Sequence, residues 1–172
     1  TTPTTMVVTS RLVSMRASKR KMRIYVVSAM FGALLSTVAL ADIYESGFVR
    51  VTPEELEWQQ LEPGLDVAIL EGDPGGEGYY ILRARFSPGV LSRPHFHPND
   101  RFITVIKGTW WTGIGSEWDK ESMVPLGPGS YMKHPGGAPH YDGAMEEEVV
   151  VEIRGMGPAP LVYVDSSGEP IH

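Results

Sequence analysis

The sequence contains no cysteine among its 172 residues. That absence excludes disulfide bonds, thiol nucleophiles and zinc sites built on cysteine. Acidic residues are absent from the first 41 positions, which carry six lysines and arginines. Strand patterns that alternate with helical ones are missing too, so a parallel α/β sheet is not expected. The chain is long enough for one domain with a substantial core.

The first 41 residues combine a basic segment with an apolar one. The apolar run IYVVSAMFGALLSTVALA follows the basic residues, is interrupted by Ser, Gly and Thr, and ends with Ala39 and Ala41 in small-residue positions. This order predicts a secretory signal peptide that is cleaved between Ala41 and Asp42, with a single transmembrane anchor as the alternative. Because the first residue is Thr, we also expect an over-extended start. The predicted location is periplasmic or secreted.

The charge balance shifts once the predicted signal peptide is set aside. The whole chain has 15 basic and 21 acidic residues, and six bases lie in residues 1–41, so residues 42–172 hold 9 bases, 21 acids and a net charge of −12. A surface this acidic argues against nucleic acid and anionic membranes as partners. We therefore expect a small-molecule ligand, no nucleic acid and no membrane contact after signal cleavage, and we leave a homodimer open.

Residues 42–172 are predicted to form a single all-β domain. One short helical turn is expected in TPEELEWQQL, where Thr52 can cap, Pro53 suits the first helical position and Glu55 completes a capping box. Elsewhere, short β-branched or aromatic runs alternate with clusters rich in Gly and Pro, as in an antiparallel sandwich or barrel. The predicted strands are 65–72, 78–86, 101–115, 129–134 and 147–155.

Two histidines stand two positions apart in the segment RPHFHPNDRFITVIKG. Side chains two residues apart on a strand point to the same side, so His95, His97 and Arg101 are expected to share one face. Imidazole suits iron, zinc, copper and nickel, and three such ligands leave positions open for water or substrate. His140 ends the turn-rich stretch GPGSYMKHPGGAPH and is the candidate third ligand from a second strand.

The spacing of these residues resembles the two motifs of the cupin family, G(X)5HXH(X)3–4E(X)6G and G(X)5PXG(X)2H(X)3N. The first motif is matched from Gly89 to Gly108, and the second from Gly129 to Ala144. The blocks HPNDRFITVIKGTWW and EIRGMGP are also similar to a group of exported bacterial cupins of unassigned activity, in which an arginine after HPxD is usual. The resemblance implies a cupin jelly roll, a double-stranded β-helix barrel of six to eight strands.

The resemblance also implies a metal site. The ligand roles carry over to His95, His97 and His140, which would hold one divalent ion of iron, manganese, nickel or zinc. Two positions depart from the motifs, because Arg101 replaces the ligand Glu and Ala144 replaces the final Asn. A guanidinium has no lone pair to offer a metal, so Arg101 cannot take over the role of the carboxylate.

Three roles for Arg101 remain open. It can clamp an anionic group of a substrate, because its fork fits a carboxylate or phosphate. It can pair with an internal acid, for which Glu152 in VVVEIRG is the best candidate, or it can merely fill space in a barrel that has lost its metal. Arg101 and Glu152 are the candidate catalytic residues. His134, which precedes the turn, is expected to be exposed or hydrogen-bonded away from the site.

Two functions follow from this reading, and the fold does not choose between them. The first is a small metal-dependent enzyme of the dioxygenase, isomerase or lyase type, which acts on a small and anionic molecule. The second is a non-catalytic module that binds or senses a small ligand. An acid or base placed beside the metal would distinguish the enzyme from the binding module.

Overall fold

The computed structural model describes residues 47–171. The signal peptide predicted for residues 1–41 lies outside the described residues. Within residues 47–171, no helix is both long and apolar enough to cross a membrane. The regular structure in this range is almost entirely β-strand, which confirms the all-β class expected from the sequence.

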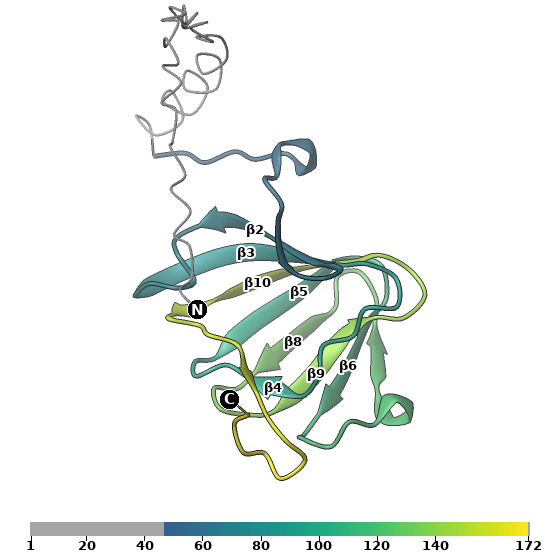
Figure 1. Ribbon diagram of the computed structural model, residues 1–172. Coiled ribbons are helices and arrows are strands. Elements are labelled where there is room, and N and C mark those ends of the chain that lie inside the picture. The colour runs from purple at the N-terminus through teal and green to yellow at the C-terminus, as the bar shows by residue number, and fades with distance from the viewer. Residues whose placement is uncertain (1–46, 172) are drawn as a thin grey trace, which may run out of the picture. The chain divides into compact units, whose positions relative to one another are not determined.

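The strands form two antiparallel sheets, labelled in Figure 1. The six-stranded sheet has the order β1 (Gln59–Glu62), β2 (Leu65–Glu71), β3 (Gly78–Phe86), β10 (Val149–Gly157), β5 (Arg101–Lys107) and β8 (Tyr131–His134). The five-stranded sheet has the order β11 (Val162–Tyr163), β4 (His95–Phe96), β9 (His140–Ala144), β6 (Trp110–Ile114) and β7 (Val124–Leu126). Strand β10 lies between β3 and β5 and pairs with both, so this sheet forms only when β10 pairs with strands far before it in the sequence.

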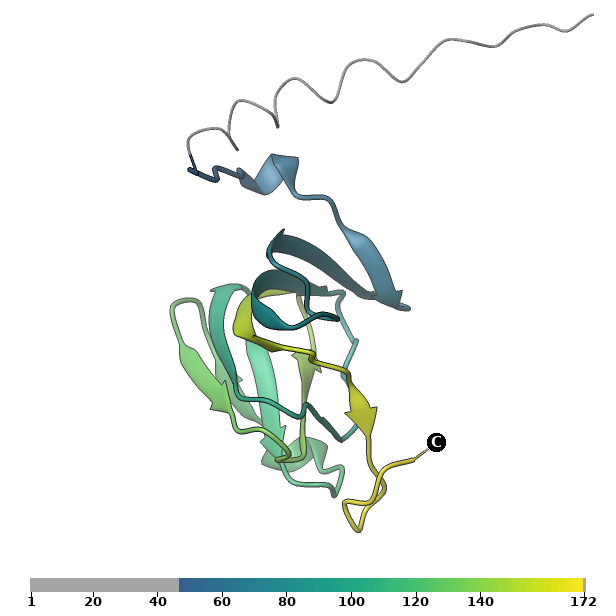
Figure 2. The same ribbon diagram turned by 90° about the vertical axis from the view of Figure 1, so that its left-hand side faces the viewer.

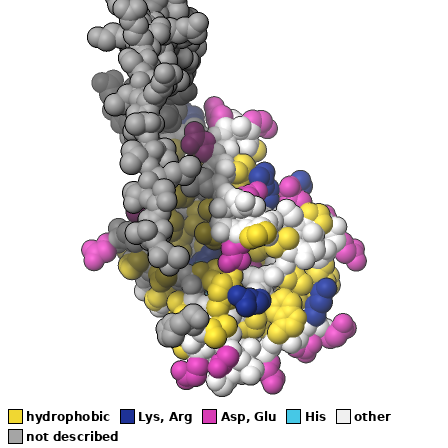
Figure 3. Space-filling view, viewed as in Figure 1, with side chains coloured by type: hydrophobic (Ala, Val, Ile, Leu, Met, Phe, Trp, Pro, Cys, Tyr) yellow, Lys and Arg dark blue, Asp and Glu magenta, His cyan; other side chains and the backbone are white. Residues whose placement is uncertain are grey.

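Alternation along the strands gives the six-stranded sheet a buried and a polar face. On β3 the buried residues are Tyr80, Leu82, Ala84 and Phe86, and arginines occupy positions between them. The same alternation on β10 buries Val149, Val151 and Ile153 in one core cluster with the β3 side chains. On the face drawn in Figure 3, acidic side chains are spread between hydrophobic ones.

The segment that follows β10 crosses from one sheet to the other. In Figure 2 this yellow C-terminal segment runs from β10 to β11, which pairs with β4. Tyr163 then lies opposite His95 in the register. Residues 158–161 therefore run close to the two histidines that the sequence analysis singled out.

One strand prediction needs correction. The run predicted as one strand over 101–115 divides at Gly108 into β5 and β6, which belong to different sheets. Gly108 has φ +74°, and a Cβ at this position would lie 2.3 Å from the carbonyl oxygen of Glu148, so the crossing point requires glycine. In the segment expected to contain one short helical turn, a single 3-10 turn (η1, Pro53–Glu55) forms and is followed by β1, which pairs with β2. A second 3-10 turn, η2, covers Lys120–Ser122.

Candidate metal and ligand site

Side chains from both sheets surround a cavity of about 440 Å³. The wall formed by the six-stranded sheet is apolar and includes Leu65, Leu82, Phe86, Ile103, Val151 and Ile153. The polar side chains that line the cavity are Ser92, His95, His97, Arg101, His134 and Asp142. A concave, mostly apolar space with a few converging polar groups is the usual form of a small-molecule site.

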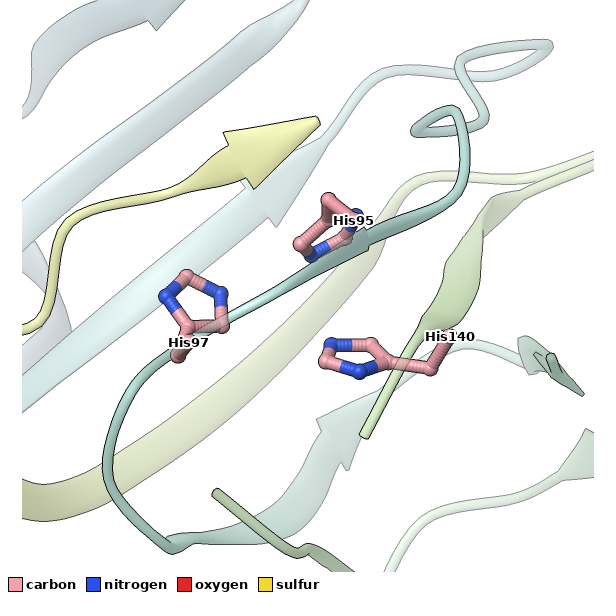
Figure 4. A group of neighbouring side chains, drawn as sticks. All are labelled: His95, His97 and His140. Atoms are coloured by element: carbon pink, nitrogen blue, oxygen red, sulfur yellow. The ribbon is translucent and has the colours of Figure 1, made fainter. Parts of the chain in front are cut away.

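Two of the three predicted metal ligands, His95 and His97, line this cavity, and His140 lies beside them. His95 on β4 lies directly opposite His140 on β9 in the register, and His97 follows β4. Figure 4 shows the three side chains extending toward one another from these two segments. One ligand nitrogen from each residue lies within 4.8 Å of the others, and all three side chains are buried. This spacing can accommodate a metal ion with bonds of about 2.0–2.2 Å.

Backbone hydrogen bonds set the tautomer of each ring. Nδ1 of His95 lies 2.8 Å from the carbonyl oxygen of Arg93, and Nδ1 of His140 lies 2.9 Å from that of Ala138. Nδ1 of His97 lies 3.0 Å from the carbonyl oxygen of Pro160. A carbonyl only accepts, so each Nδ1 carries the proton and each Nε2 keeps a lone pair. Metal-binding histidines in proteins are oriented in the same way.

The buried position keeps the imidazoles of His97 and His140 neutral. Burial and, to a smaller extent, the positive charge of Arg101 lower the pKa of His97 from 6.5 to about 2. Burial lowers the pKa of His140 from 6.5 to about 4. Neutral imidazole is the form that coordinates a metal, so these residues are ready to bind at neutral pH without losing a proton. The described residues thus fit the metal that the cupin motifs imply.

Arg101 points into the cavity, as its parity with the histidines predicts. Its guanidinium donates to Nε2 of His97 and also interacts with the hydroxyl of Tyr80. Gly155 lies opposite Arg101 in the register, and a Cβ there would lie 2.9 Å from the Tyr80 oxygen, so this glycine makes room for the pair. Nε of Arg101 is buried without a partner, which leaves one donor for a ligand.

The predicted pair between Arg101 and Glu152 is wrong. Glu152 lies on the outer face of β10, where its carboxylate is 3.4 Å from Arg83 and 3.6 Å from Arg154. The residue opposite Arg101 on β10 is Gly155, whose parity is that of the buried Ile153 and not that of Glu152. Glu152 therefore cannot act on a molecule in the cavity.

Sequence reasoning missed two polar residues of the cavity, His134 and Asp142. His134 was expected to lie away from the site, but it is 3% exposed and its ring centroid is 3.7 Å from that of His140. Asp142 is buried two residues after His140 and accepts a bond of 3.4 Å from the Ser92 hydroxyl. Parity with His140 could have identified Asp142, because both follow the alternation that links His95 and His97.

Comparisons with known proteins find similar folds among solved structures. No family model matches the sequence, and no curated protein matches it. A polyketide cyclase from Streptomyces resistomycificus superimposes with a TM-score of 0.56 and 22% identity, over 67% of this chain and 84% of that one. An RmlC-like cupin from Ralstonia eutropha gives 0.55 and 18%, over 76% and 81% of the two chains. A sugar phosphate isomerase of the cupin superfamily from Silicibacter pomeroyi gives 0.52 and 16%, over 67% and 82%.

These superpositions cover 67% to 76% of this chain. The protein has the cupin fold. Within this fold, His95, His97 and His140 occupy the three histidine positions of the two motifs, and Arg101 occupies the position of the carboxylate. The fold brings the matched histidines together as the motifs imply, whereas Arg101 adds a positive charge that a cupin metal site with glutamate would not contain.

Proposed function

We propose that the protein is an exported, metal-dependent cupin enzyme that acts on a small molecule with an apolar body and an anionic group. The observation that carries this proposal is the set of three buried imidazoles, each with Nδ1 bonded to a backbone carbonyl and Nε2 left with a lone pair. A divalent ion held there would polarise a substrate oxygen or activate a water molecule. Dioxygenase, isomerase and lyase chemistry all use such a centre, and the proposal extends to these three types.

The side chains that line the cavity support a substrate with an anionic group and an apolar body. Arg101 supplies a positive charge and a free Nε–H, and Trp110 on the same cavity has a buried Nε1–H without a partner. Two unsatisfied buried donors favour a ligand that offers acceptor oxygens, because each such group is costly to leave unpaired. The apolar wall excludes water around the rest of the molecule. One water molecule takes up about 30 Å³ in the liquid, so 440 Å³ corresponds to the volume of about 15 water molecules.

Asp142 replaces Glu152 as the internal carboxylate that the enzyme hypothesis requires. It is the carboxylate among the described residues that line the cavity, and its negative charge acts on both His140 and Arg101. A base inside the cavity is the feature expected of an enzyme and not required of a binding module. This position therefore favours catalysis over simple capture of a ligand.

Metal binding tests the first half of the proposal. Protein purified from the periplasm and treated with a chelator should bind one equivalent of Fe(II), Mn(II), Ni(II) or Zn(II), measured by titration and elemental analysis. His140→Phe should abolish binding, and Glu152→Gln, on the outer face, should leave it unchanged. A parent protein that takes up none of the four ions would refute the proposed function. N-terminal sequencing of the same material tests cleavage after Ala41.

A series of straight-chain carboxylates tests the second half. Carboxylates of six to twelve carbons should bind more tightly than the alcohols of equal length, as measured by calorimetry. Arg101→Gln should remove this preference, because the charge and the free donor are lost together. Arg83→Gln is the matched control, since Arg83 lies on the outer face of the same sheet and pairs with Glu152. Equal binding of acids and alcohols by the parent protein would contradict an anionic substrate.

A further inference from the structure

His134, His140 and Asp142 form a second group of possible metal ligands in the same barrel. One ligand atom from each residue lies within 4.8 Å of the other two, and all three residues are buried. They come from β8 and β9, which belong to different sheets. Two imidazoles and one carboxylate are the ligand set of many non-haem iron centres, and they also suit zinc and manganese.

The state of His134 points to a ligand at this position. Both of its ring nitrogens are buried and neither has a hydrogen-bond partner. A neutral imidazole offers one donor and one acceptor, so both functions are unsatisfied. Nε2 of His140 is likewise buried and unpaired, and it faces the same group. Buried polar groups are normally satisfied, and a bound ion would satisfy His134 and His140 at once.

Arg101 distinguishes the two positions. Its guanidinium donates to Nε2 of His97, so one of the three nitrogens in the first group is already engaged. No such bond engages His134 or Nε2 of His140. An ion at either position would lie near the guanidinium, because Arg101 is opposite His134 in the register of β5 and β8, but only the second position includes the carboxylate of Asp142. Opposite charge in a low-dielectric interior favours the second position.

We propose that His134, His140 and Asp142 form a second metal position, which the ion occupies while Arg101 contacts His97. His140 belongs to both groups, and its Nδ1 is bonded to the Ala138 carbonyl, so only Nε2 is available to a metal. The two positions are therefore alternatives for a single ion. The inference rests on the proposed function in one respect, namely that the chain binds a divalent ion.

Binding of Co(II) to the chelator-treated full-length product tests the second position. The variants are His134→Phe, Asp142→Asn and His97→Phe, which keep side-chain size while removing one ligand each. We expect one equivalent of Co(II) for the parent, at least a tenfold loss of affinity for His134→Phe and Asp142→Asn, and a change under threefold for His97→Phe. Thermal unfolding without metal serves as the folding control, and His134→Phe should not lower the midpoint because it removes two unsatisfied nitrogens.

The possible outcomes separate the two proposals. Loss of affinity in His97→Phe alone would place the ion among His95, His97 and His140 and overturn the second position. Loss in all three variants would make His97 a ligand too and would equally overturn it. Failure of the parent protein to bind Co(II), Zn(II) or Fe(II) would instead refute the proposed function.

Discussion

The two faces of the six-stranded sheet treat charge in opposite ways. On the outer face Arg85 is 2.7 Å from Asp66, and Arg83 and Arg154 share Glu152. On the inner face Arg101 contacts an imidazole and a phenol, and its Nε has no partner. All four arginines are on strands of one sheet, so the position of each residue in the alternation of its strand decides whether its side chain lies on the outer or the inner face. Outer arginines are paired with carboxylates, whereas the inner one is available to a ligand.

The burial of the inner face should dominate stability. Ile103 is 1% exposed at the centre of the core, and Ile103→Ala should lower the free energy of unfolding by about 2–5 kcal/mol, because it leaves a cavity in packed surroundings. Thr104→Ala is the matched control on the adjacent outer-face position, whose hydroxyl accepts from Arg154. It should cost about 1 kcal/mol. Urea unfolding measures both, and equal losses would erase the difference between the faces.

Acid should destabilise the metal-free protein through the inner histidines. In the unfolded chain the pKa of histidine is about 6.5, and in the folded protein burial lowers it to about 4 for His140 and about 2 for His97. The unfolded chain therefore gains protons below pH 6.5 that the folded protein does not bind. Burial lowers the pKa of His134 as well. Stability is fully present above pH 6.5 and should fall by about 4 kcal/mol per pH unit for the three groups, down to about pH 4.

Urea unfolding of chelator-treated protein at pH 7.5, 6.5 and 5.5 measures this effect. His97→Phe is the variant that tests this further, since it removes one of the three titrating histidines and should lower the slope by about a third. A free energy of unfolding that stays constant from pH 7.5 to 5.5 would show that the inner imidazoles are not held neutral by burial.

Replacing the inner arginine should tighten metal binding. Arg101→Gln frees Nε2 of His97 and removes a positive charge, so affinity for Zn(II) should rise at least tenfold, or about 1.4 kcal/mol. Arg101→Glu restores the carboxylate of the cupin motif and should bind at least as tightly. Arg154→Gln is the control from the outer face. Titration measures all three, and an unchanged affinity in both Arg101 variants would mean that the guanidinium does not compete with the metal.

The smallest effect is expected from the outer ion pairs. Glu152→Gln should change the free energy of unfolding by no more than about 1 kcal/mol, because its pairs with Arg83 and Arg154 are long and in contact with solvent. Metal and carboxylate binding should remain at parental values. A loss of metal or carboxylate binding in this variant would mean that Glu152 acts at the site, contrary to its position on the outer face of β10.

Local spacing in the sequence was enough to predict most of the metal site. The alternation of a strand places His95, His97 and Arg101 on one side, and the turn-rich segment before His140 supplies a third histidine from another strand. The structure places His95, His97 and Arg101 at one cavity and His140 beside the two histidines. Such predictions succeed because side-chain direction on a strand repeats every two residues, whatever the strand pairs with.

The same rule, applied fully, would have corrected one error. Glu152 and Arg154 flank Ile153, and two charged residues around an apolar one indicate a solvent face on a half-buried strand. Three consecutive valines before Glu152 hid this alternation, and a single acid in an apolar run was interpreted as internal. Likewise, Asp142 shares the parity of His140 but was not considered.

His134 is the residue that only the tertiary structure could place. It lies opposite Arg101 because β5 pairs with β8, and against His140 because the two sheets pack face to face. No periodicity within β8 indicates either contact. The amino-acid sequence determined which residues can share a face, through the two-residue repeat of the strand. The long-range register and the packing of the sheets decided which faces meet, because those depend on hydrogen bonds and burial between segments far apart in the chain.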